Sequence, residues 1–103
     1  MTGASRARAA LLQTFVDGRR GLRLGTLFGA PAVFAGRRVA IRLEADAVAV
    51  RLGPAGQDLA RALCRGRVLG LHRGWLRLAA PRGTATAAYL TLFEHAVRDV
   101  ATA

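Results

Sequence analysis

The chain has 103 residues, 52% of them hydrophobic, and a chain of this length supports one hydrophobic core. Its single cysteine, Cys64, excludes an internal disulfide and a metal site built from several cysteines. The longest run without a charged residue, 24–36, is shorter than the roughly 20 residues that a membrane-spanning helix needs. We therefore expect a cytoplasmic protein without a membrane partner.

The formal net charge is +10, and all 16 basic residues are arginine. Arginine presents a planar fork of hydrogen-bond donors that suits phosphate and carboxylate groups, so this charge indicates an anionic partner. A second interpretation has equal weight. A strongly GC-biased genome would also give a chain that is rich in Ala, Gly, Leu and Arg and lacks Asn, without any selection for binding.

Apolar residues at helical spacing predict a first helix over 4–16, and Gly18 follows where a left-handed cap residue would end it. Three strand candidates come next, at 22–28, 38–44 and 47–52, with a bend after the first. The second and third candidates alternate apolar residues with arginine or alanine, which is typical of half-buried antiparallel strands. The residues expected to face the core are Val39, Ile41, Leu43, Val48, Val50 and Leu52.

In the second half of the chain, 57–65 is expected to form a short helix. Two more strands are expected at 68–71 and 75–79, with a tight turn or a bulge between them. Thr84 or Thr86 would cap a final helix by accepting a hydrogen bond from an unpaired backbone N–H.

These elements predict an α+β fold. We expect an antiparallel sheet of about four to five strands, packed with an N-terminal, a short middle and a C-terminal helix. One domain would span 1–103, with residues 1–5 frayed at its start.

A glycine-rich centre leads into the predicted hairpin. It runs Gly25-Thr-Leu-Phe-Gly-Ala-Pro-Ala-Val-Phe-Ala-Gly-Arg-Arg-Val-Ala-Ile-Arg-Leu, continues as Asp46-Ala-Val-Ala-Val-Arg-Leu, and is followed later by a Gly74-Trp75-Leu76 step. In these stretches the chain resembles the TfoX N-terminal domain family, which shares a YjbR-like fold. The resemblance implies helices packed on an antiparallel sheet, and the two-domain members are linked to the regulation of natural competence. The methionine that often precedes the Phe-Gly pair is Leu27 here.

Residues suited to covalent or metal-assisted catalysis are few. The nucleophile candidates are Ser5, near the N-terminus, and Cys64, which we expect to be a small buried residue of a helix. The histidines, His72 and His95, have no carboxylate or cysteine at a recognisable ligand spacing. We therefore expect no catalytic residue, no metal and no cofactor, and a protein that is not an enzyme.

One set of residues predicts a binding surface. If the alternation holds, Arg38, Arg42 and Arg51 share the face opposite the core, and Trp75 and Arg77 extend this face from a neighbouring strand. The arginines would contact phosphates while Trp75 stacks on a base, an interaction worth about 1 to 3 kcal/mol per base. The leading hypothesis is thus a non-enzymatic, regulatory module that binds an anionic partner, with nucleic acid as the first candidate.

Two alternatives remain open. Ala40 and Ala49 are small enough to let a helix lie on the arginine face, which would bury Trp75 and leave the arginines at the rim of a structural contact. In the other, the chain is a protein-interaction or self-association module, in which a sheet edge or an apolar patch pairs with another chain.

Overall fold

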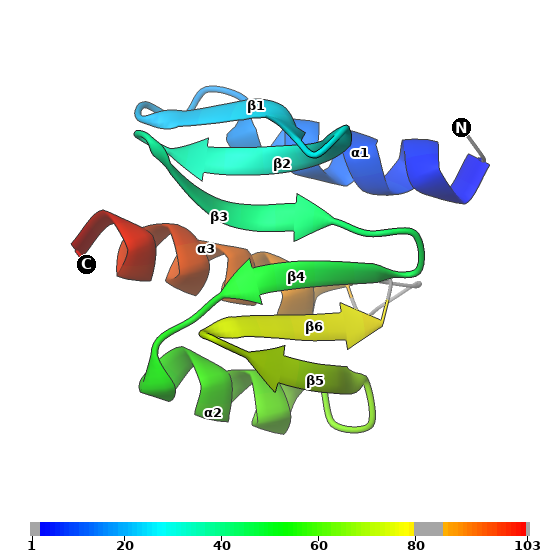
Figure 1. Cartoon of the computed structure of the whole chain (residues 1–103), viewed down its shortest axis with the longest axis vertical. Coiled ribbons are helices and arrows are strands. Elements are labelled where there is room, and N and C mark those ends of the chain that lie inside the picture. Colours follow the sequence, from blue (N-terminus) through cyan, green and yellow to red (C-terminus); the bar gives the residue numbers. More distant parts are fainter. Residues whose placement is uncertain (1–2, 80–85, 103) are drawn as a thin grey trace.

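The computed structural model of the chain describes residues 3–79 and 86–102, which form three helices and six strands (Figure 1). In chain order these are α1 (Gly3–Val16), β1 (Leu22–Leu27), β2 (Ala30–Ala35), β3 (Arg38–Leu43), β4 (Ala47–Arg51), α2 (Pro54–Leu63), β5 (Val68–His72), β6 (Trp75–Ala79) and α3 (Thr86–Thr102). Residues 1–2 of the expected frayed end and Thr84, one of the two expected caps, lie outside the described residues.

The strands form one antiparallel sheet in the order β1-β2-β3-β4-β6-β5. The predicted α+β class and the three helices are confirmed, but the sheet has six strands instead of about four to five. After β4 the chain passes through α2 and re-enters the sheet as β5, which leaves one strand position open between β4 and β5. Strand β6 then returns between β4 and β5, which leaves β5 at the edge of the sheet.

The strand that the sequence did not indicate is β2, which contains Pro31. Proline lacks the N–H group that a strand ladder uses, and together with Gly29 it suggested only a bend. The register between β2 and β3 reaches no further than Ala32, so Pro31 has a neighbouring strand on one side alone. Proline is tolerated at such a position because it interrupts no ladder on the open side.

Two hairpins close through two-residue turns of the same kind. Leu27 pairs with Ala30 around Phe28 and Gly29, and His72 pairs with Trp75 around Arg73 and Gly74. All four turn residues have positive φ, between 50° and 83°. A type I′ turn needs this conformation at both central positions, and its twist matches that of the flanking strands.

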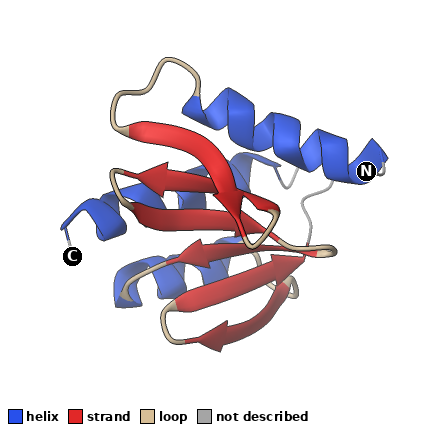
Figure 2. Ribbon diagram, turned by 45° about the horizontal axis from the view of Figure 1, so that its top comes forward, coloured by secondary structure: helices blue, strands red, loops and turns tan. Residues whose placement is uncertain are grey.

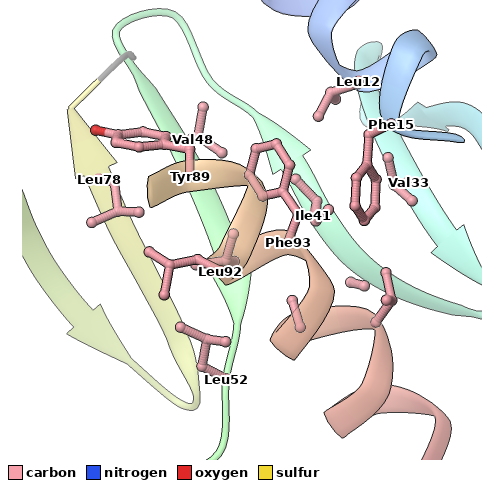
Figure 3. Packing of buried hydrophobic residues seen from close by; sticks show 14 of the residues in the cluster. Leu12, Phe15, Val33, Ile41, Val48, Leu52, Leu78, Tyr89, Leu92 and Phe93 are labelled. Atoms are coloured by element: carbon pink, nitrogen blue, oxygen red, sulfur yellow. The ribbon is translucent and has the colours of Figure 1, made fainter. Parts of the chain in front are cut away.

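All three helices pack against one face of the sheet, and the opposite face carries no helix (Figures 1 and 2). Between the layers, α3 contributes the fully buried side chains of Tyr89, Leu92 and Phe93. Figure 3 shows Phe93 beside Ile41 of β3, and its ring meets that of Phe15 edge to face at 5.5 Å between centroids. The sheet contributes Val33, Ile41, Leu43, Val48, Val50, Leu76 and Leu78 to the same core.

A β-bulge changes the predicted alternation at the start of β3. The partner of β2 moves from Ile41 to Val39 in one step, so Ala40 is the extra residue. Ala40 is consequently buried in the core cluster, whereas Val39 pairs with Phe34 and is only half-buried. The prediction that Val39 joins the core is therefore wrong, although Ile41, Leu43, Val48, Val50 and Leu52 are buried as expected.

Polar contacts attach α3 to the segment that follows α1 and to the two ends of the β5–β6 hairpin. Arg19, just after α1, forms a two-pronged salt bridge with Glu94, and the guanidinium lowers the pKa of that carboxyl group. The Tyr89 hydroxyl donates to the carbonyl oxygen of Ala79 and accepts from Arg67 Nε at 2.9 Å. Tyr89 is therefore buried with its polar end satisfied.

Two glycines in the β5–β6 hairpin test the turn geometry. Gly74 has φ +83°, whereas Gly70 has no positive φ, and an added Cβ at Gly70 would meet no atom within 4 Å. We expect Gly74→Ala to lower the free energy of unfolding by about 1–2 kcal/mol, the cost of a Cβ in the left-handed region. Gly70→Ala should leave it unchanged or raise it by up to about 1 kcal/mol. Urea denaturation measures both values, and equal losses at the two positions would contradict the assigned turn.

Candidate functional site

The helix-free face of the sheet carries the predicted arginines and tryptophan. In the register, Arg42 pairs with Ala49, Ala49 with Arg77, and Arg51 with Trp75, so these side chains share the face opposite the core. Ala49 is fully buried although no described helix covers it, and its register partners on the two neighbouring strands are Arg42 and Arg77. The alternative that a helix lies on this face is therefore wrong.

Trp75, the first residue of β6, contacts two of these arginines. The guanidinium carbon of Arg42 lies 4.7 Å from the centroid of the Trp75 ring, and that of Arg51 lies 5.6 Å from it. Such cation–π contacts contribute about 0.5–1 kcal/mol each at exposed sites. They hold two positive charges within one small area, and the ring itself is left half-buried.

Glu44 compensates part of the positive charge. It accepts from Arg77 Nε at 2.8 Å and lies 3.4 Å from a guanidinium nitrogen of Arg42. Arg77 is thus directed toward Glu44, at the end of β3. Arg38 and Arg51 are exposed and form no ion pair with another described residue, so their charges remain available to a partner.

A cavity of about 640 Å³ opens at the end of the sheet where β3 begins and β4 ends. Its wall includes Trp75, four arginines and one carboxylate; the charged residues are Arg37, Arg38, Arg42, Arg51 and Asp99. The Asp99 carboxylate accepts from the backbone N–H of Gly53 at 2.9 Å, just before α2 begins. The described wall is therefore strongly positive and suits an anion.

Four of the five predicted site residues line this cavity. Arg38, Arg42, Arg51 and Trp75 line it, and Arg77 does not. The bulge also takes Arg38 out of phase with Arg42, because Arg38 pairs with Ala35, a residue that packs against the core. Arg38 reaches the cavity through its place at the end of β3 and not through the strand alternation on which its prediction depended.

Eight of the twelve residues that line the cavity were not predicted as site residues, and three of them show why. Arg37 directly precedes Arg38, so its position in the sequence was a signal that could have added it to the predicted site residues. Asp99 comes from the last turns of α3, and Leu27 comes from the far end of β1. In Figure 2 the β1–β2 hairpin curls out of the sheet toward the helix-free side, and Leu27 is the last residue of β1 before its turn. No local sequence pattern predicts the bend of this hairpin.

The residues considered for catalysis lie elsewhere. Cys64 is buried at the end of α2, and burial raises the pKa of its thiol above the ordinary value. The other described groups with a shifted pKa, Arg19, Tyr89 and Glu94, do not line the cavity either. Within 3–79 and 86–102, no three potential metal ligands come together. In the same part of the chain, no helix is both long and apolar enough to cross a membrane.

Comparisons of the chain with protein-family models, with curated proteins and with solved structures found no match.

Trp75 is the one tryptophan of the chain, so its fluorescence reports on this site alone. We expect iodide to quench it more strongly than caesium, because the arginines attract anions. Arg51→Ala should reduce quenching by iodide and increase quenching by caesium, whereas Arg65→Ala, at an exposed arginine that does not line the cavity, should change neither. Equal quenching by the two ions in the unmodified protein would contradict the positive field.

Proposed function

We propose that the chain is a non-enzymatic regulatory module that binds nucleic acid through the arginine-lined cavity and the adjoining helix-free face of the sheet. The observation that carries this proposal is the gathering of Arg38, Arg42 and Arg51 around Trp75 in one cavity wall. A chain with a net charge of +10 also attracts a polyanion over long distances.

The form of the site favours a phosphate backbone over a small carboxylate ligand. The arginines of the wall come from the start of β3, its middle and the end of β4, so their charges are spread over an extended area. Guanidinium groups bind phosphate oxygens in a two-pronged geometry, and each neutralised phosphate releases condensed counterions. A chain of phosphates uses such a spread of charges better than one small anion does.

Membership of the TfoX N-terminal domain family is part of the proposal. The helices packed on an antiparallel sheet are what the resemblance implies, and they support it. The family assignment adds the regulatory role, whereas the proposed nucleic-acid binding depends only on the arginines and Trp75.

Binding to short DNA at increasing salt concentration tests the proposal. We expect an affinity that falls linearly on a logarithmic scale, by about 0.7 per phosphate contact for a single strand. Arg38→Glu combined with Arg51→Glu should weaken binding at least tenfold at low salt and flatten this slope. Neither residue has an ion pair among the described residues, so the fold should be retained.

The matched control is Arg20→Glu combined with Arg65→Glu. Both arginines are exposed and neither lines the cavity, so the change in net charge is the same. The control should lose little affinity. Binding that is absent at low salt, independent of salt, or equally weakened by both double variants would refute the proposal.

A second candidate function, protein interaction or self-association, is favoured by one observation. The edge strand β5 and the neighbouring end of α2 expose three leucines, Leu63, Leu69 and Leu71. An edge strand presents unpaired backbone groups, and exposed leucines beside it add an apolar surface for another chain.

Sedimentation velocity at several protein concentrations tests this candidate. Self-association through β5 predicts a sedimentation coefficient that rises with concentration and a dissociation constant at least tenfold higher in Leu69→Glu. Thr91→Glu serves as the control, because it introduces the same charge at an exposed position of α3. A strict monomer that also captures no partner chain would leave the candidate without support.

A further inference from the structure

The strongest unexplained feature outside the cavity is Phe28, at the tip of the β1–β2 hairpin. Its side chain is 95% exposed, far more than any other large apolar side chain among the described residues. Its ring makes no aromatic or cation–π contact with another described residue. Phe28 therefore adds nothing to the core or to the packing of the hairpin.

The backbone conformation at Phe28 is also unusual for an exposed aromatic residue. Its φ is +52°, in the left-handed region, where bulky residues are rare and Gly, Asn and Asp are preferred. Among the described residues, the other non-glycine residue with positive φ is Arg73, which occupies the same turn position but has a polar side chain suited to solvent. At Phe28 an unfavourable backbone conformation thus presents an aromatic ring to water, which points to a use outside the fold.

The position of the tip connects Phe28 with the arginines. The preceding residue, Leu27, lines the cavity with Arg42 and Trp75. Figure 2 shows the β1–β2 hairpin curling out of the sheet toward its helix-free side, which is the side of the arginines. A ligand that follows the cavity wall as far as Leu27 would therefore meet Phe28 as the next residue of the hairpin.

The two aromatic residues differ in what covers them. In the free protein the Trp75 ring is occupied by the guanidinium groups of Arg42 and Arg51. The Phe28 ring is open. A base could stack on Phe28 without displacing any protein group, so Phe28 and not Trp75 is the first stacking position that the site offers.

We propose that Phe28 stacks on an unpaired base of a single-stranded nucleic acid whose phosphates lie along Arg38, Arg42 and Arg51. This inference rests on the proposed function and specifies its ligand. In a duplex the base faces are covered by their neighbours, whereas a single strand can turn a base outward onto an aromatic ring. A neutral ring at the rim of a cationic cavity provides both parts of such a site.

Fluorescence anisotropy with a labelled ten-nucleotide oligothymidine and with a ten-base-pair duplex tests the inference. We expect Phe28→Asn to weaken binding of the single strand by about 5- to 100-fold, the loss of one stacked base. Duplex binding should stay the same. The salt slope should also stay the same, because a neutral side chain releases no counterions. Phe28→Trp should retain the full affinity.

Thermal unfolding separates this role from a structural one. Asparagine tolerates positive φ better than phenylalanine, so Phe28→Asn should raise the melting temperature by a few degrees, about 2–8 °C. A variant that is more stable but binds less tightly cannot owe its loss to misfolding. Thr91→Asn is the control, because it introduces the same residue at an exposed position of α3 that does not line the cavity, and it should leave binding unchanged.

The outcomes distinguish this inference from the proposed function. If Phe28→Asn binds the single strand as tightly as the unmodified protein while Arg38→Glu with Arg51→Glu weakens it, the stacking role is refuted and the proposed function stands. If Phe28→Asn loses mainly duplex binding, Phe28 is a wedge between base pairs, and the single-strand assignment is refuted. If the unmodified protein binds neither ligand at low salt, both proposals are refuted.

Discussion

The one-sided packing of the sheet is the constraint on which the other features depend. Each side chain of β3, β4 and β6 must point to one of two faces, and helices cover only one of them. Apolar residues such as Ile41 and Val50 fill the covered face, where burying a large aliphatic side chain contributes about 1.5–3 kcal/mol. Residues of the opposite phase, such as Arg51 and Trp75, therefore face outward together. The core and the arginine face are two results of the same alternation.

The arginine face is stabilised by its own contacts and not by a covering layer. Arg42 and Arg51 lie over Trp75, and Glu44 holds Arg77 and approaches Arg42. These contacts shield the centre of the sheet from water and keep the guanidinium groups in place. The side chains of Arg42 and Arg77 are thereby held in place before any ligand binds, which reduces the loss of conformational entropy on binding.

Departures from regular geometry give the site its shape. The bulge at Ala40 moves Val39 out of the core, and Val39 lines the cavity instead. The β1–β2 hairpin curls toward the helix-free side, where Leu27 lines the cavity and the next residue, Phe28, is exposed. Bulges and tight turns often occur where a strand must direct a side chain toward a ligand. The two departures meet on the face that carries the arginines.

The sequence by itself determined the helices, most of the strands, the buried residues of the central hairpin except Val39, and the common face of Arg42, Arg51, Trp75 and Arg77. These depend on local periodicity, which a pattern of two or about 3.6 residues records directly. Strand β2 was not predicted from the sequence, because the effect of Pro31 on a strand depends on which neighbouring strand is present. Only the tertiary structure decided which face the helices cover, where the bulge lies and which residues surround the cavity. These depend on contacts between segments far apart in the chain, as when Asp99 of α3 and Leu27 of β1 line one wall, and no local pattern encodes them.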